Sequence, residues 1–161
     1  MAFELGSILT ERALTLSTAE SCTGGLIGHI ITGTPGSSAY FMGGIISYSN
    51  LAKIELLDVS PDTLEEYGAV SAQTAMEMAS GVRMKFHTDI GVSVTGIAGP
   101  DGGSSHKPVG TVYMGFADRA DRFSIRYKFS GSREDIKRQT AETVLENIKR
   151  KLNGDTFIPG I

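Results

Sequence analysis

The sequence is poor in features that several classes of protein require. Its 161 residues include a single cysteine, Cys22, so neither an internal disulfide nor a cysteine-based metal site can form. No apolar run is long enough to cross a membrane. Residues 1–12 carry acidic charge and lack the apolar core of a signal peptide. We therefore expect a cytoplasmic protein without membrane contact.

Clustered positive charge is also missing. The chain has 15 Lys and Arg against 18 Asp and Glu, a net charge of −3, and the basic residues are spread along it. This distribution argues against a nucleic-acid partner. With 40% hydrophobic and 20% charged residues, the length and composition are typical of one globular domain, which we place at residues 1–161.

Strand and helix patterns alternate along most of the chain. Strands are predicted at residues 15–20, 44–49 and 89–96, and a closing hairpin at 111–117 and 122–130. This order predicts an α/β fold, a three-layer α/β/α sandwich with a mixed, mainly parallel sheet. An irregular tail follows residue 152 and leaves room for packing on a second subunit in a homo-oligomer.

Ligands of such sheets bind outside the carboxyl ends of the parallel strands. Three segments rich in Gly or Ser follow predicted strands there, and we expect them to converge on one crevice. These segments are residues 20–25, 47–53 and 95–103.

The first segment, "AESCTGG", places two nucleophile-capable residues, Ser21 and Cys22, at a predicted strand-to-helix turn. Ser21 or Thr23 would cap the following helix, whose N–H groups are able to hold a phosphate or an oxyanion. Gly24 and Gly25 would let a substrate approach the backbone. The turn lacks the G-x-S-x-G, GxxxxGK[ST] and GxGxxG motifs. The pattern alone therefore leaves a plain helix cap open.

A serine nucleophile needs a base. His29 and His87 fit surface or packing roles, and His106 has no evident Asp partner, so a Ser-His-Asp triad is poorly supported. Lys53 follows a predicted strand that ends near Tyr48, and a lysine buried in a crevice loses its proton more easily. Spacing alone, however, favours a solvated Lys53 and a core-edge Tyr48.

Two further segments suggest ligand binding. Thr95 and Gly96 lead from a predicted strand into a long Gly-rich loop, where hydroxyl and backbone groups would bind a phosphate, ribose or amide. Arg133 opens the last predicted helix, where a cation opposes the helix dipole. That position hints at anion binding, because Arg forks onto phosphate, although a nearby Asp or Glu would also pair with it.

Five motifs occur in the order found in the C-terminal domain of the competence/damage-inducible protein CinA. They are "AESCTGG", "GGIISYSNLAK", "YGAVSAQTAMEMASG", "VTGIAGPDGG" with "KPVGTV", and "SGSRED". The resemblance covers residues 5–152. In this family the same domain also occurs alone, as the nicotinamide mononucleotide deamidase. The separate N-terminal domain of CinA, with its pyrophosphatase activity, has no counterpart in these residues.

The resemblance implies hydrolysis of the carboxamide of nicotinamide mononucleotide to nicotinate mononucleotide and ammonia, without a metal or organic cofactor. It assigns the nucleophile to Ser21, the base to Lys53 and an assisting role to Tyr48. It also matches Thr95 and Arg133, although the family's closing G-D-R motif reads "GSR" here.

In the mechanism that we expect, backbone N–H groups near Thr23 to Gly25 form the oxyanion hole, and Arg133 with the Thr95 loop holds the phosphate and ribose. Cys22 points away from the crevice and packs the helix start. The alternative is a nucleotide-binding module of the same family without catalysis.

Overall fold

The computed structural model describes residues 2–161 of the chain. Its helices and strands alternate as the sequence pattern predicts. In chain order they are α1 (Ala2–Glu11), β1 (Leu16–Glu20), α2 (Leu26–Thr32), the 3-10 helix η1 (Ser37–Ala39), β2 (Phe41–Ile46), α3 (Asn50–Leu57), α4 (Pro61–Tyr67), α5 (Ala72–Phe86), β3 (Ile90–Gly96), β4 (Thr111–Ala117), β5 (Arg122–Lys128) and α6 (Arg133–Asn153).

The strands form one five-stranded sheet in the order β2-β1-β3-β4-β5. β1 runs parallel to both β2 and β3, whereas β4 pairs antiparallel with β3 and with β5. The predicted hairpin is therefore the antiparallel side of the sheet. All five residues of β1 are buried, as expected for a central strand.

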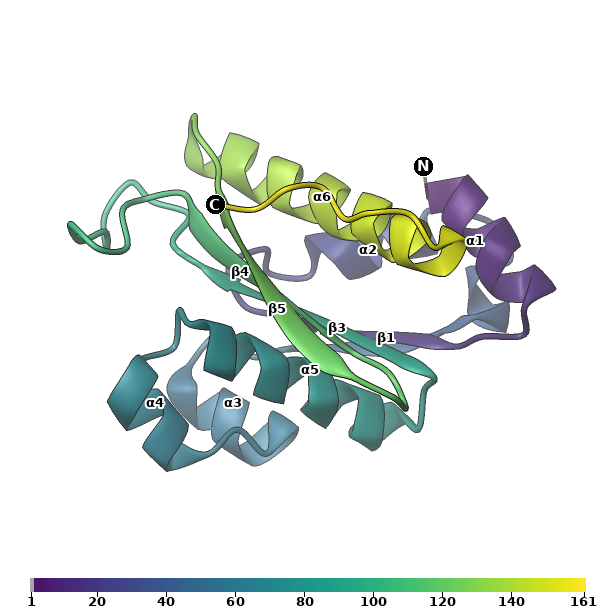
Figure 1. Ribbon diagram of the computed structural model, residues 1–161, viewed down its shortest axis with the longest axis horizontal. Coiled ribbons are helices and arrows are strands. Elements are labelled where there is room, and N and C mark those ends of the chain that lie inside the picture. Colours follow the sequence, from purple (N-terminus) through teal and green to yellow (C-terminus); the bar gives the residue numbers. More distant parts are fainter. Residues whose placement is uncertain (1) are drawn as a thin grey trace.

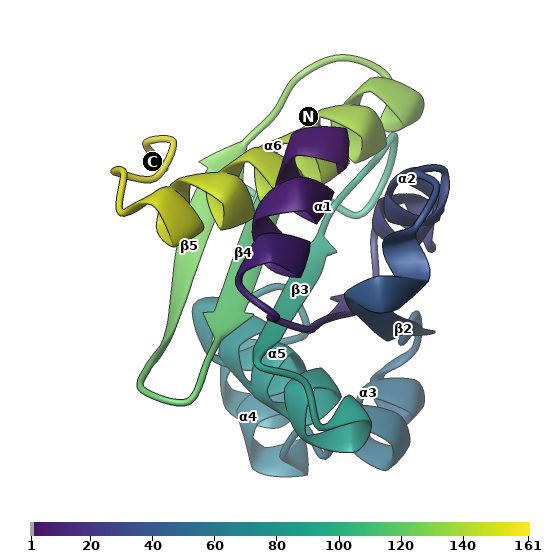
Figure 2. The ribbon, with the colours of Figure 1, turned by 90° about the vertical axis from the view of Figure 1, so that its right-hand side faces the viewer.

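Helices cover both faces of this sheet. Helices α1, α2 and α6 lie on one face, and α3, α4 and α5 on the other (Figures 1 and 2). The connections that leave β1 and β2 therefore turn to opposite faces, which opens a crevice outside the carboxyl ends of these strands. The predicted three-layer sandwich with a mixed sheet is confirmed.

Helix caps follow the sequence closely. Ser60 caps α4 with Pro61 in its first turn, and Ser132 caps α6 in a capping box with Asp135. One strand is shifted from its prediction: β2 ends at Ile46, so Tyr48 lies in the connection to α3. The chain leaves the sheet there because Ser49 caps α3, with its side chain accepting the Ala52 N–H.

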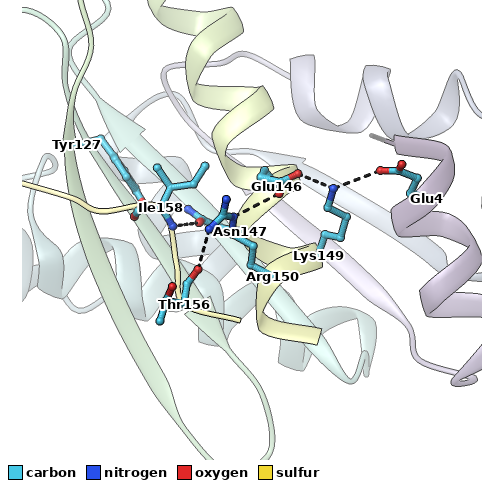
Figure 3. Close-up of polar contacts among 8 residues, drawn as sticks. All are labelled: Glu4, Tyr127, Glu146, Asn147, Lys149, Arg150, Thr156 and Ile158. Carbon is cyan, nitrogen blue, oxygen red and sulfur yellow. Dashed lines mark hydrogen bonds and ion pairs between the residues drawn. The ribbon is translucent and has the colours of Figure 1, made fainter. Parts of the chain in front are cut away.

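The C-terminal tail packs on its own chain. The amide of buried Asn147 donates to the Tyr127 hydroxyl (2.7 Å) and accepts the Ile158 N–H (2.9 Å). Tyr127 in turn donates to the Ile158 carbonyl (3.0 Å). Figure 3 shows how these contacts bring the tail against α6 and β5. The irregular tail predicted after residue 152 therefore has a defined place beside the last strand.

A charged contact links two helices of the same layer. Lys149 of α6 pairs with Glu146 one turn earlier (2.8 Å) and with Glu4 of α1 (3.2 Å), as Figure 3 also shows. Over residues 2–161, the helices are too short or too polar to span a membrane.

Candidate active site

A cavity of about 280 Å³ lies at the carboxyl ends of the parallel strands. It brings together the segments that follow β1, β2 and β3 with the start of α6. In Figure 1 the long loop after β3 and the start of α6 lie at the left-hand end of the sheet. The cavity is lined by residues 21–22, by Tyr48, Asn50 and Lys53, by residues 69–70, 95–99 and 101–102, and by Arg133.

Ser21 and Lys53 meet inside this cavity. Ser21 is the first residue after β1, and Lys53 lies in the first turn of α3. Lys53 Nζ lies 3.1 Å from Ser21 Oγ and donates to the Ser47 carbonyl at 2.7 Å. The Lys53 side chain is 1% exposed. The solvated lysine that spacing alone favoured is therefore not what the fold produces.

Burial sets the acidity of this amine. Desolvation lowers the pKa of Lys53 from its ordinary value, because the charged form loses its hydration. A neutral amine has a lone pair, and its 3.1 Å distance from the Ser21 hydroxyl is suited to accepting a proton. The pair therefore has the geometry of a nucleophile and its general base.

Cys22 borders the same cavity, contrary to the expectation that it points away. It also belongs to the main hydrophobic core and is 6% exposed. Burial raises the pKa of its thiol to about 12. Since the thiolate is the nucleophilic form, Cys22 is chemically inert near neutral pH. The predicted packing role agrees with this burial.

The turn after Ser21 differs from the predicted oxyanion hole. None of the residues 23–25 lines the cavity. The Thr23 hydroxyl donates to the Glu20 carboxylate, as does the Gly25 N–H, and the Gly24 N–H donates to the Ser21 carbonyl. These three groups are therefore bonded within the turn, and substrate contact by Thr23, Gly24 and Gly25 stays a prediction.

The capping prediction for this turn is wrong. Gly25, not Ser21 or Thr23, is the capping residue of α2, and it provides no side-chain hydrogen bond. The Glu20 carboxylate reaches over from the end of β1 and binds the free N–H groups instead.

Thr95 and Gly96 lie at the end of β3, beside Ser21, whose N–H donates to the Val94 carbonyl at 3.0 Å. The Thr95 hydroxyl, buried at the end of β3, donates to the Ala69 carbonyl at 2.7 Å and so fixes the segment before α5. A Cβ at Gly96 would come within 2.7 Å of a Val112 methyl group and 2.8 Å of the Thr111 carbonyl. Both residues line the cavity, and Gly96 is required there for close packing of β3 on β4.

Arg133 also lines the cavity and is exposed. Its guanidinium donates to the Tyr48 hydroxyl at 2.9 Å and to the Gly99 carbonyl at 2.6 Å. Within the described residues it makes no ion pair with a carboxylate, because Asp135 pairs with another arginine of α6. The alternative of simple pairing with a nearby acid is thus excluded, and the guanidinium remains available for an anion.

The three histidines lie elsewhere. None of His29, His87 and His106 lines this cavity, so the structure offers Ser21 no imidazole base. Residues 2–161 contain no group of three or more His, Cys, Asp or Glu side chains arranged to hold a metal ion.

Sequence reasoning missed several groups at the site. Asn50 and Asp101 also line the cavity, and Glu20 organises the turn beside it. A signal for Glu20 was present: it is an ionisable residue at the end of an otherwise uncharged, fully buried strand, and such groups need dedicated partners.

Comparison with known proteins points to a single family. The sequence model of the CinA C-terminal domain matches residues 1–152. A CinA-like protein from Cyanothece sp. is 51% identical over 154 residues, which cover 94% of this chain and 37% of the relative. A CinA-like protein from Acaryochloris marina is 49% identical over 153 residues, covering 94% of this chain and 36% of the relative. The chain thus spans little more than a third of these curated relatives.

Solved structures are similar over the whole domain. A competence/damage inducible protein from Agrobacterium tumefaciens superposes with a TM-score of 0.90 at 41% identity, covering 94% of this chain and 93% of that one. A CinA superfamily protein from Klebsiella pneumoniae superposes with a TM-score of 0.92 at 30% identity, covering 95% and 96%. Because both the sequence match and the fold extend over nearly all its residues, the chain belongs to the CinA C-terminal domain family.

Proposed function

We propose that this domain hydrolyses the carboxamide of nicotinamide mononucleotide to nicotinate mononucleotide and ammonia. The observation that carries the proposal is the buried pair of Lys53 Nζ and Ser21 Oγ, 3.1 Å apart, in the wall of a cavity. A noncatalytic binding module has no need of a desolvated lysine, which costs stability. The substrate itself is inferred from the family resemblance.

The first half of the reaction makes an acyl-enzyme. Lys53 takes the proton from Ser21 as Oγ attacks the carboxamide carbon, giving a tetrahedral intermediate. The carbon–nitrogen bond then breaks, and the leaving nitrogen receives the proton from Lys53 and departs as ammonia. Tyr48, whose hydroxyl is oriented by Arg133 at 2.9 Å, is placed to assist this transfer.

The second half regenerates the enzyme. Water gives a proton to Lys53 and attacks the ester carbon, and Ser21 Oγ leaves with that proton. The product carboxylate is nicotinate mononucleotide. Both half-reactions require neutral Lys53, so we expect the rate to rise with pH through the lowered pKa of this group.

Arg133 would hold the 5′-phosphate at the far end of the cavity. Its exposed guanidinium has no carboxylate partner within the described residues, and arginine binds phosphate oxygens in a bidentate manner. The loop that follows Thr95 would contact the ribose. The carboxamide would then lie toward Ser21.

Ammonia release from nicotinamide mononucleotide tests this function, with Ser21→Ala, Lys53→Ala and Cys22→Ala beside the wild type. We expect the first two variants to lose activity and the third to retain it. Calorimetry measures binding of the same compound and so distinguishes the enzyme from a noncatalytic module. Tight binding by the wild type without ammonia release would favour the module. Loss of activity in Cys22→Ala alone would instead make the thiol the nucleophile.

A further inference from the structure

Glu20 is a buried carboxylate beside the proposed nucleophile. It is the last residue of β1, it precedes Ser21, and it is 2% exposed. It does not line the cavity, so it would not touch a substrate there. Four donors converge on its two oxygens: the Thr23 hydroxyl at 2.6 Å and the N–H groups of Gly25 (3.0 Å), Ile27 (3.0 Å) and Gly28 (2.8 Å).

These bonds fix the turn that carries Ser21. Gly24 and Gly25 adopt left-handed backbone conformations, with φ of 63° and 99°, which reverse the chain between β1 and α2. The Glu20 carboxylate ties the start of α2 back to the end of β1 and places negative charge at the positive end of the helix. Ser21 lies between these two fixed points.

The main chain of Glu20 holds the other partner. Its carbonyl accepts the Ser47 N–H at 2.8 Å, and the Ser47 carbonyl accepts a hydrogen bond from Lys53 Nζ at 2.7 Å. Both sides of the Ser21–Lys53 contact are therefore linked to the same residue. The side chain fixes the turn after Ser21, and the main chain fixes the carbonyl that orients Lys53.

We propose that the Glu20 side chain is a positioning residue, which keeps Ser21 Oγ within hydrogen-bond distance of Lys53 Nζ. Its importance for catalysis rests on the proposed function, whereas its effect on geometry does not. Small displacements of a nucleophile from its base have large effects on rate, whereas substrate contacts at Arg133 would be unaffected.

Glu20→Gln keeps the size of the side chain but replaces an acceptor oxygen by an NH2 group that faces N–H donors. We expect kcat to fall by about 10²-fold with KM changed by less than about threefold. A crystal structure of the variant should show Ser21 Oγ farther than hydrogen-bond distance from Lys53 Nζ. Thr23→Val removes one of the four donors and should have the same effects in weaker form. This variant keeps the test possible if Glu20→Gln does not fold.

Asp89→Asn is the matched control. Asp89 accepts the Thr15 N–H and hydroxyl, both at 2.9 Å, at the opposite end of the sheet from the cavity. Loss of these Asp89 contacts should lower Tm, as loss of the Glu20 contacts should, but leave kcat unchanged. This control separates positioning of the nucleophile from a general loss of stability.

The proposal is overturned if Glu20→Gln and Thr23→Val keep the Ser21–Lys53 distance and the wild-type kcat, whatever their Tm. If the wild type releases no ammonia, the proposed function fails but the structural test still applies. A lengthened Ser21–Lys53 distance in Glu20→Gln then supports the positioning role, and an unchanged distance refutes it.

Discussion

Two cations border the same cavity, and their surroundings give them different chemistry. Lys53 lies in α3, is 1% exposed, and has a pKa lowered by burial. Arg133 opens α6 at the surface, and its guanidinium keeps its charge in any protein environment. Lys53 is therefore suited to proton transfer, and Arg133 is suited to holding an anion.

Both cations also occupy positions that cost stability. A lysine without water around it loses hydration, and a cation in the first turn of α6 opposes the helix dipole. Ser132 and Asp135 cap the same helix end with favourable groups, which makes Arg133 the exception there. Two unfavourable placements at one cavity are typical of a functional site, where residues are arranged for chemistry at the expense of stability.

Replacing one cation by the other gives the sharpest test of this difference. In Lys53→Arg a positive charge is retained, but the guanidinium cannot lose its proton and so cannot act as a base. We expect ammonia release from nicotinamide mononucleotide to fall by about 10³-fold or more. Ser21→Ala sets the background rate. A rate within about tenfold of wild type would contradict the role of Lys53 as base.

Removing the exposed cation should affect mainly binding, and proton transfer only through the Tyr48 hydroxyl that Arg133 orients. For Arg133→Met we expect the KM for nicotinamide mononucleotide to rise by about 10- to 100-fold, the cost of a lost charged hydrogen bond. Hydrolysis of nicotinamide riboside, which lacks the phosphate, should lose much less, because only the orientation of Tyr48 changes. Arg138→Met is the control, because Arg138 also lies on α6 but pairs with Asp135. Equal losses with both substrates would contradict phosphate binding by Arg133.

The arrangement of strands and helices was predictable because its signals are local. Alternating apolar runs gave the order of elements, and Ser60 and Ser132, residues of the preferred capping type, stand at two helix starts. The end of β2 was harder to predict from the sequence. Apolar and β-branched residues before Tyr48 favour a longer strand, whereas the cap at Ser49 and the Ser47 carbonyl that accepts from Lys53 end it early.

The chemistry of the site depends on contacts that the sequence does not display. Burial of Lys53 depends on long-range packing around α3, which contacts α5, so spacing alone favoured a solvated residue. Glu20 binds N–H groups five to eight residues farther along, and backbone donors carry no sequence signal. For the same reason the sequence did not show that the Gly24 and Gly25 N–H groups are hydrogen-bonded within the turn.

The lowered pKa of Lys53 should also appear in stability. Between the pKa of the folded state and the ordinary value of 10.5, the unfolded chain binds a proton that the folded chain has released. The free energy of unfolding therefore rises with pH in this window, by at most about 1.4 kcal/mol per pH unit. Lys53→Met lacks this group. Denaturant unfolding of both proteins should show a difference that grows in favour of wild type up to pH 10.5, and a constant difference would refute the shift.

Substitution of Cys22 should have the smallest effect on activity, although its thiol lies near both Lys53 and Arg133. Its thiol lies close enough to both cations for each to act on its charge, and it directly follows Ser21. With a pKa raised to about 12 by burial, it remains protonated at the pH where Lys53 would act. We therefore expect Cys22→Ala to retain kcat within about twofold while losing about 1 kcal/mol of stability from the small cavity it leaves.

Steady-state ammonia release and denaturant unfolding measure these two effects on Cys22→Ala separately. Cys22→Ser provides the control, because it keeps the size of the side chain but buries a hydroxyl. If both variants lost activity as completely as Ser21→Ala, the thiol would be the nucleophile, and Lys53 would then serve to lower its pKa as a cation. The two cations would in that case share one electrostatic role, and the division between base and anion holder would be wrong.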